Sequence, residues 1–162
     1  MKTILEFDLE KATQTLNHLA RKEGGKIDKM KAIKLIWLAD RFHLRKYGRP
    51  ILNDNYLAME YGPVGSAVKD IADNSDFLSS EEQKYSNEYI KPDDKKYFVE
   101  SIKEVDLEVF SETDLEAIDA VYAIYGKEHA LGLADMSHSF PEWEKFKEEF
   151  LSGNISRANM SY

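Results

Sequence analysis

Asp40 and His43 form the pair of side chains whose types and spacing best suit catalysis. They lie three positions apart in a segment that is predicted to be helical, so both project from the same face. A carboxylate that orients an imidazole is one half of a nucleophilic triad. No nucleophile in a strained turn completes the triad, because Ser66 falls inside a predicted helix. A hydrolase or nuclease that uses Asp40, His43 and Tyr61, with or without a metal, is therefore an alternative and not the first interpretation.

Other signatures of catalysis or cofactor binding are absent from the sequence. The Gly-Pro-Val-Gly run at 62–65 lacks the spacing of a phosphate-binding loop, and neither a GxSxG elbow nor an HExxH zinc motif occurs. The four histidines are scattered, and the absence of cysteine excludes disulfides, iron–sulfur clusters, thiolate zinc sites and a cysteine nucleophile. We therefore expect a protein that is not an enzyme and that carries neither a metal nor another cofactor.

The composition favours a single domain that binds another protein. The chain has 162 residues, of which 43% are hydrophobic, enough to fill one core. A net charge of −8 makes direct nucleic-acid binding unfavourable but suits a neutral or basic protein partner. The same charge can also serve solubility alone. No apolar run approaches the ~20 residues that span a bilayer, and no signal-peptide core is present, so we expect a cytoplasmic protein with no membrane partner.

The elements that must position these residues are mostly helical. Helical spacing and capping residues predict helices over 9–22, 29–47, 63–73, 112–125 and 141–151. The second of these is apolar on two sides, so it is expected to be central, with the charged ends of its lysines and arginines in water. We expect a mainly α fold of α+β character: one compact helical domain, residues 1–162, with one small antiparallel hairpin at 87–101 and a loose polar tail from about 152.

Asp40 occupies an unusual position within the expected central helix. At 100° per residue it lies near the middle of an apolar stripe that includes Ile33 and Trp37. A buried carboxylate must be hydrogen-bonded or paired. We expect Asp40 to brace its helix against the segment 56–65, where Pro63 is expected to start a helix with free N–H groups. The expected brace consists of Asp40, His43, Arg49, Gly62 and Pro63.

The segment that carries this pattern resembles a known family. KLIWLADRFHLRKYGRPILNDNYLAMEYGPV, residues 34–64, resembles the signature of the Panacea domain, also called the SocA-like antitoxin domain. The matching runs are L-A-D-R-x-H-L-x-x-Y-G-R-P-I at 38–51 and Y-x-A-x-x-x-G-P-V at 56–64. The resemblance is strongest over 33–73 and extends more loosely over roughly 10–150. It implies a mostly helical fold with a small antiparallel sheet.

The resemblance also implies a role. Members are found in bacteria, prophages and plasmids, and act as antitoxins that neutralise a cognate toxin by direct protein contact. The toxin is expected to be encoded by the adjacent gene, and delivery of the toxin to a protease is a variant of this role. A phage-associated structural or interaction protein is a further alternative. Tyr and Met are favoured at protein interfaces but equally cover cores. The expected toxin contacts are Arg41, Tyr47, Tyr56, Met59 and Tyr61.

Overall fold

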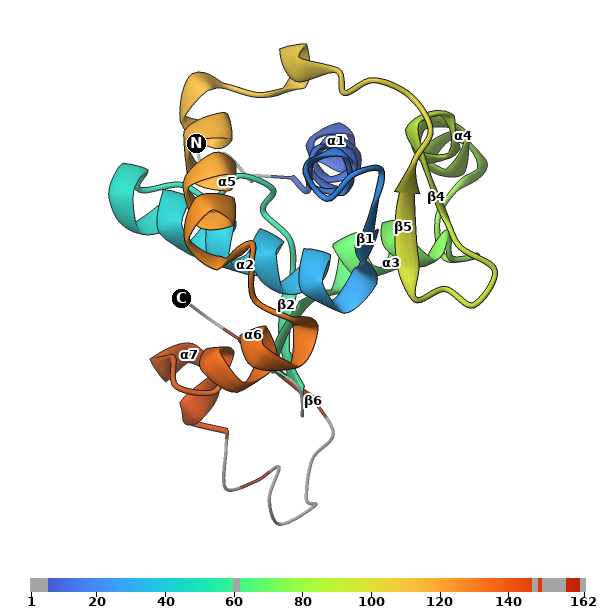
Figure 1. Cartoon of the computed structure of the whole chain (residues 1–162). Coiled ribbons are helices and arrows are strands. Elements are labelled where there is room, and N and C mark those ends of the chain that lie inside the picture. Colours follow the sequence, from blue (N-terminus) through green and yellow to red (C-terminus); the bar gives the residue numbers. More distant parts are fainter. Residues whose placement is uncertain (1–5, 60–61, 147–148, 150–156, 161–162) are drawn as a thin grey trace.

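Helix α2 (Lys29–Tyr47) forms the axis of the fold. In the computed structural model, which describes residues 6–59, 62–146, 149 and 157–160, this helix packs against helices from both ends of the chain. Its neighbours are α1 (Leu9–Lys22), α3 (Ser66–Asp73), α5 (Glu112–Tyr125) and α6 (Ala130–Ser137), as Figure 1 shows. Every residue from Ala32 to Asp40 is buried, which confirms the central position that the two apolar sides of this helix predicted.

Local capping signals fix where three long helices begin. Asp8 accepts a hydrogen bond from the N–H of Lys11 and Asp28 accepts one from Lys31, both at 2.9 Å, so α1 and α2 begin where expected. Ser111 forms a capping box at the start of α5. Three further elements complete the list of helices in the described part of the chain: α4 (Ser80–Tyr89), the 3-10 turn η1 (Leu107–Val109) and α7 (Pro141–Glu144).

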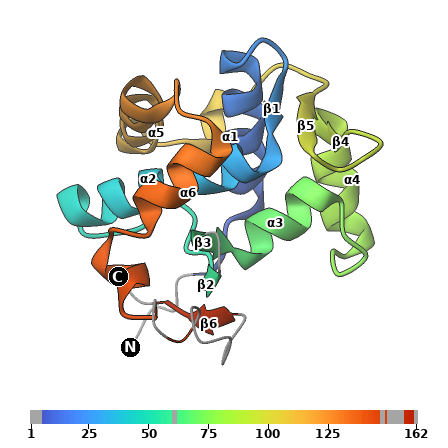
Figure 2. The same ribbon diagram turned by 60° about the horizontal axis from the view of Figure 1, so that its bottom comes forward.

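Two small antiparallel sheets lie beside the helices. The first has the order β1-β5-β4, from β1 (Lys26–Asp28), β5 (Phe98–Ser101) and β4 (Ile90–Pro92), and contains the expected hairpin. The second has the order β3-β2-β6, from β3 (Gly62–Gly65), β2 (Tyr56–Met59) and β6 (Arg157–Asn159). Figure 2 shows the second sheet gathered below α2 and α3. The mainly α fold is confirmed. The described residues form two three-stranded sheets, whereas only one hairpin was predicted.

The segment 56–65 differs most from the expectation. It forms the β2–β3 hairpin, with Ala58 opposite Pro63, and α3 begins only at Ser66. Proline is tolerated here because β3 is an edge of its sheet, where its missing N–H costs no ladder hydrogen bond. The N–H groups at the start of α3, at Ala67 and Val68, are bonded by the carboxylate of Asp54 at 3.0 Å.

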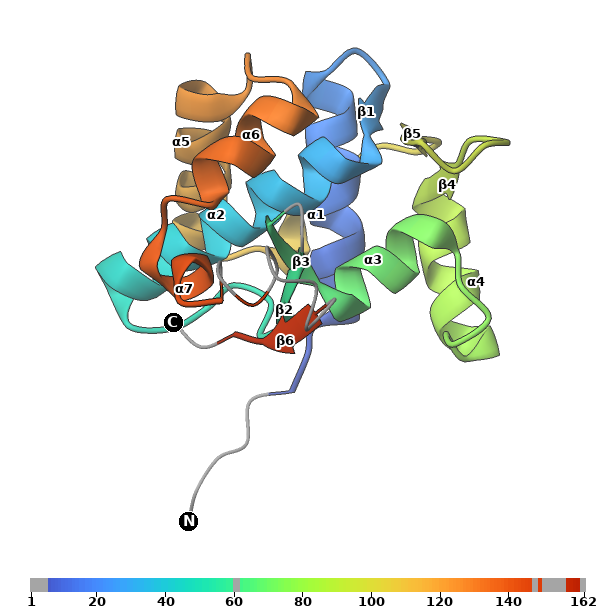
Figure 3. The same cartoon turned by 90° about the horizontal axis from the view of Figure 1, so that it is seen from below.

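The end of the chain differs as well. The last helix was expected over 141–151, whereas α7 ends at Glu144 and its N-cap is Phe140. Part of the remaining range lies outside the described residues. In the tail that was expected to be loose, Arg157–Asn159 form β6 on the hairpin β2–β3. Seen from below in Figure 3, the second sheet lies between α3 on one side and α6 and α7 on the other. No helix in the described ranges is both long enough and apolar enough to cross a membrane.

Candidate functional site

Asp40 ties helix α2 to the segment that follows it. Its side chain is fully buried, and its Oδ1 accepts hydrogen bonds from the N–H groups of Ile51 at 2.7 Å and Leu52 at 3.1 Å. The hydroxyl of Tyr56 donates to its Oδ2. Asp40 is the hydrogen-bond acceptor that was expected. The prediction that its donors are N–H groups near Gly62–Gly65 is wrong. The carboxylate is engaged by the nearer segment 51–56, and Asp54 occupies the N-terminus of α3 instead.

Burial governs the protonation of Asp40. Removal from water raises the pKa of this carboxyl to about 6, although the hydrogen bonds from Tyr56, Ile51 and Leu52 act to lower the pKa. The group is therefore mainly ionised at neutral pH and gains a proton under mildly acidic conditions. Since all three donors point at it, the carboxylate acts as an acceptor at the junction of α2 and β2.

His43 does not pair with Asp40. Its Nδ1 lies 2.6 Å from the carbonyl oxygen of Arg49, and its Nε2 lies 2.8 Å from the hydroxyl oxygen of Thr113. Because a carbonyl can only accept, Nδ1 donates, and in the neutral ring Nε2 accepts from Thr113. The imidazole is fully buried. It therefore joins α2 to the following loop and to the start of α5, and the catalytic dyad of the sequence interpretation is not formed.

Arg49 and Asp114 add a second contact to α5 and extend this junction to α1. The Nη2 of Arg49 lies 3.1 Å from Oδ1 of Asp114, and the Nζ of Lys11 lies 2.8 Å from its Oδ2. Burial alone would raise the pKa of Asp114, but hydrogen bonds from Lys11 and Ser111 outweigh it and lower the pKa. Asp114 was not predicted to belong to the site, because its place in the capping box of α5 already explains a carboxylate there. Asp40, His43 and Asp114 are fully buried, whereas the side chain of Arg49 is 40% exposed. We call these four residues the buried polar network, in which Asp40 bonds the segment 51–56 and the other three connect the helices.

Lys34 is a further buried ionisable group, whereas its charged end was expected to lie in water. Its side chain is 2% exposed, and its Nζ donates to the carbonyl oxygen of Pro63 at 2.6 Å. Burial lowers the pKa of this amine to about 7. The expected contact between the central helix and Pro63 therefore exists, but a lysine makes it. Neighbouring Gly62 has φ +106°, and a Cβ there would collide with the hydroxyl of Ser137 in α6. This close approach requires glycine.

The residues that were expected to contact a toxin lie in different environments. Arg41 stacks on Phe140 at 4.3 Å and pairs with Glu142 at 3.1 Å. Tyr47 is exposed, whereas Tyr56 is 4% exposed and engaged by Asp40. Met59 is half-buried, and its carbonyl oxygen accepts from the indole of Trp143 at 2.6 Å. Tyr61 lies outside the described residues. Of the described members of this set, Arg41 and Tyr47 are the two that lie on α2 with part of their side chains at the surface.

Comparison with known proteins gives one match. A family model described as antitoxin SocA-like, Panacea domain, matches residues 33–144. The matched span contains all four members of the buried polar network. No curated protein and no solved structure matches the chain. Within the described residues, no group of three or more His, Cys, Asp or Glu side chains could hold a metal ion.

Proposed function

The chain belongs to the family of SocA-like antitoxins that share the Panacea domain, and we propose on this basis that it neutralises a cognate toxin by direct protein–protein binding. The family match is the observation that carries the proposal. The partner is a toxin protein, and the gene adjacent to this one is the place to look for it. Neither a nucleic acid nor a membrane is part of the proposal.

The burial of Asp40 and His43 supports a binding role over catalysis by this pair. Both side chains have no exposed surface, and their polar atoms are bonded within the chain. A general base must reach the proton that it abstracts, which a fully buried imidazole cannot do from this position.

The same contacts favour a preorganised surface. The buried polar network joins α1, α2, α5 and the loop after α2, so these elements keep a fixed arrangement. A surface that is rigid before binding loses less conformational entropy when a partner docks. This is what an antitoxin that acts by occupying its toxin requires.

The test is co-expression followed by titration of the purified proteins. The chain should restore growth of cells that express the adjacent gene product, and the two proteins should co-elute. A binding antitoxin reaches full neutralisation at an equimolar ratio. An enzyme would reach it at a much lower ratio, and an adaptor would shorten the lifetime of the toxin only while the protease is present. If the adjacent gene product neither binds nor is neutralised, the proposal is wrong.

His43→Gln provides a matched control for the enzymatic alternative. Glutamine can still donate and accept one hydrogen bond each, but it cannot act as a general base at neutral pH. We expect this variant to neutralise at the same equimolar ratio as the wild type if it remains folded. If His43→Gln still forms the complex but no longer neutralises the toxin, the result would instead favour an enzymatic mechanism.

A further inference from the structure

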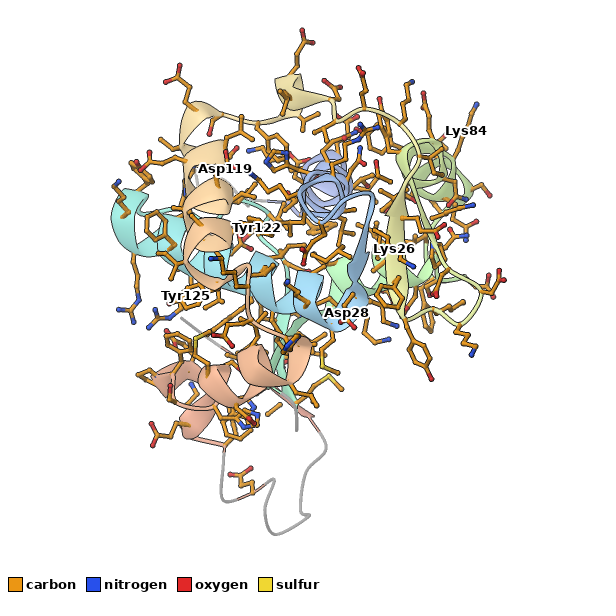
Figure 4. The ribbon with its side chains drawn as sticks, in the orientation of Figure 1. Lys26, Asp28, Lys84, Asp119, Tyr122 and Tyr125 are labelled. Carbon is orange, nitrogen blue, oxygen red and sulfur yellow. The ribbon has the colours of Figure 1, made fainter. Side chains whose placement is uncertain are left out.

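A groove with an apolar floor opens on the surface between α2 and α5. It has a volume of about 390 Å³ and is lined by Leu38, Phe42, Ile124, Tyr125 and Phe140, together with three basic side chains. Ile124 is 66% exposed although it stands beside buried neighbours, so its side chain is apolar surface that no element of the described chain covers. Tyr125, labelled in Figure 4, marks the end of α5 that borders the groove. We call this feature the α2–α5 groove.

The rim of the groove is basic although the chain is acidic. Its charged lining residues are Arg41, Arg45 and Lys46, with no carboxylate among them, whereas the chain as a whole has a net charge of −8. The nearest carboxylates only partly balance them. Glu142 lies 3.1 Å from Arg41 and 3.5 Å from Arg45, and Glu116 pairs with Lys46. Among the described ion pairs, three cations thus share two carboxylates, and the side chain of Arg45 stays 62% exposed.

The arrangement also holds the cations in place. The guanidinium of Arg41 is fixed between the ring of Phe140 and the carboxylate of Glu142. Glu142 is buried and holds Arg41 at the edge of the groove, and it attracts the more exposed Arg45 to the same edge from 3.5 Å. Charged groups that are oriented before binding pair with an incoming carboxylate at a lower entropic cost.

We propose that the α2–α5 groove is the docking site for a segment of the toxin that presents an apolar side chain flanked by acidic residues. The proposal rests on the proposed function. The apolar partner side chain covers Ile124 and the floor, and the flanking carboxylates pair with Arg45 and Lys46. Complementary charge selects the partner and its register, while the buried apolar anchor supplies most of the affinity. The charge of the groove is opposite to that of the whole chain, so net charge alone points to the wrong kind of toxin surface.

The absence of cysteine from the chain allows a direct footprint. Single-cysteine variants Ile124→Cys and Leu131→Cys place a thiol at two positions of nearly equal exposure, 66% and 65%, on α5 and α6. Each is reacted with a maleimide, with and without the adjacent gene product, and the modification of this chain is followed by mass spectrometry. We expect the toxin to slow labelling at 124 by at least about tenfold and to leave labelling at 131 nearly unchanged, as a buried anchor at the centre of an interface requires.

Charge reversal tests the rim. Arg45→Glu should weaken the complex by at least about tenfold and reduce its salt dependence, because it places like charges across the interface. Lys84→Glu makes the same charge change on α4, at an exposed site on the opposite side of the molecule in Figure 4, and should bind as the wild type does. Thermal unfolding of Lys84→Glu should match the wild type, since Lys84 is exposed. Arg45→Glu loses the pair with Glu142 and should unfold at a lower temperature, so its binding is measured well below its unfolding midpoint, with circular dichroism confirming the fold.

The outcomes separate the two proposals. If the wild-type complex forms but labelling at 124 and binding by Arg45→Glu are unaffected, the groove assignment is overturned and the antitoxin function stands. If labelling at position 124 slows at high concentration of this chain without the toxin, a second copy of the chain occupies the groove. That result also overturns the assignment. If the wild-type chain binds no adjacent gene product, the antitoxin function fails, and the groove assignment fails with it.

Discussion

Tyr56 donates its hydroxyl hydrogen bond to the carboxylate of Asp40, sixteen positions earlier in the chain. The contact joins the first residue of β2 to the central helix α2, and both side chains are buried. It therefore fixes where the β2–β3 hairpin starts relative to the helix. Because Oδ1 of the same carboxylate holds the N–H groups of Ile51 and Leu52, one side chain fixes three points of the connection between α2 and β2.

Removal of the Asp40 carboxylate should destabilise the fold. Asp40→Asn is expected to lower the free energy of unfolding by about 1–3 kcal/mol, because it weakens hydrogen bonds to a buried charged acceptor. Asp40→Ala should cost more, since it leaves two backbone N–H groups without an acceptor. Urea unfolding monitored by circular dichroism measures both. Asp135→Asn, at an exposed site on α6, is the matched control and should leave the midpoint unchanged. An unchanged midpoint in both Asp40 variants would contradict the assigned role.

Lys34 should make stability depend on pH in the alkaline range. Burial lowers the pKa of this amine from 10.5 to about 7 in the folded chain, so between these values the unfolded chain binds a proton that the folded chain does not. The free energy of unfolding therefore rises with pH from about 7 towards 10. Lys34→Met removes this slope: the variant should gain stability relative to the wild type at pH 6–7, and lose that advantage by about pH 10, a change of several kcal/mol.

The difference between wild type and variant at each pH isolates Lys34 from other titrating groups. Lys84→Met, in which an exposed lysine is removed, should show the same pH profile as the wild type. A constant offset between wild type and Lys34→Met across this range would mean that Lys34 keeps its ordinary pKa.

Gly62→Ala should cost more than the strain of its backbone conformation alone. Gly24 has φ +90° with no atom within 4 Å of the point that a Cβ would occupy, so Gly24→Ala reports the strain only, about 1 kcal/mol. At Gly62, φ is +106° and the Cβ would also run into Ser137. We expect Gly62→Ala to cost about 1–3 kcal/mol more than Gly24→Ala. Ser137→Ala should recover part of the excess in a double-mutant cycle, and additive costs would rule out the clash.

Asp114 should contribute stability that acid removes. Its pKa lies below 3.8 in the folded chain, so the group stabilises the fold above that value and its contribution is lost as the pH falls through the folded pKa. Asp114→Asn is expected to cost about 1–3 kcal/mol at pH 7. The cost should shrink as the pH is lowered below about 4. Urea midpoints of wild type and variant between pH 3 and 7 measure it, and a difference that stays constant with pH would contradict the ion pairs with Arg49 and Lys11.

Much of the fold follows from short-range patterns in the sequence. The starts of α1, α2 and α5 depend on a side chain that bonds an N–H group three residues later, and the end of α2 on Gly48 in the left-handed conformation. These interactions lie within one helical turn. The central position of α2 could also be predicted locally, because the helix has apolar residues on two of its sides. The presence of a buried acceptor at Asp40 could be predicted because a carboxylate on an apolar stripe must find donors.

The identity of the partners could not be predicted in the same way. Asp40 can reach several donors from the central helix, and only the path of the chain after Gly48 brings Ile51, Leu52 and Tyr56 to it. Asp54 takes the N-terminus of α3 for the same reason.

The sequence by itself determined the helical class, the helix caps, the central helix and the family resemblance, because each depends on residues close together in the chain. Only the tertiary structure decided the second sheet, in which Leu57 pairs with Asn159, and the burial of Lys34. It also decided that α2 and α5 enclose a groove with a basic rim in an acidic protein. The physical reason is that burial and charge pairing are set by segments about a hundred residues apart, such as Arg41 and Glu142, which no local pattern records.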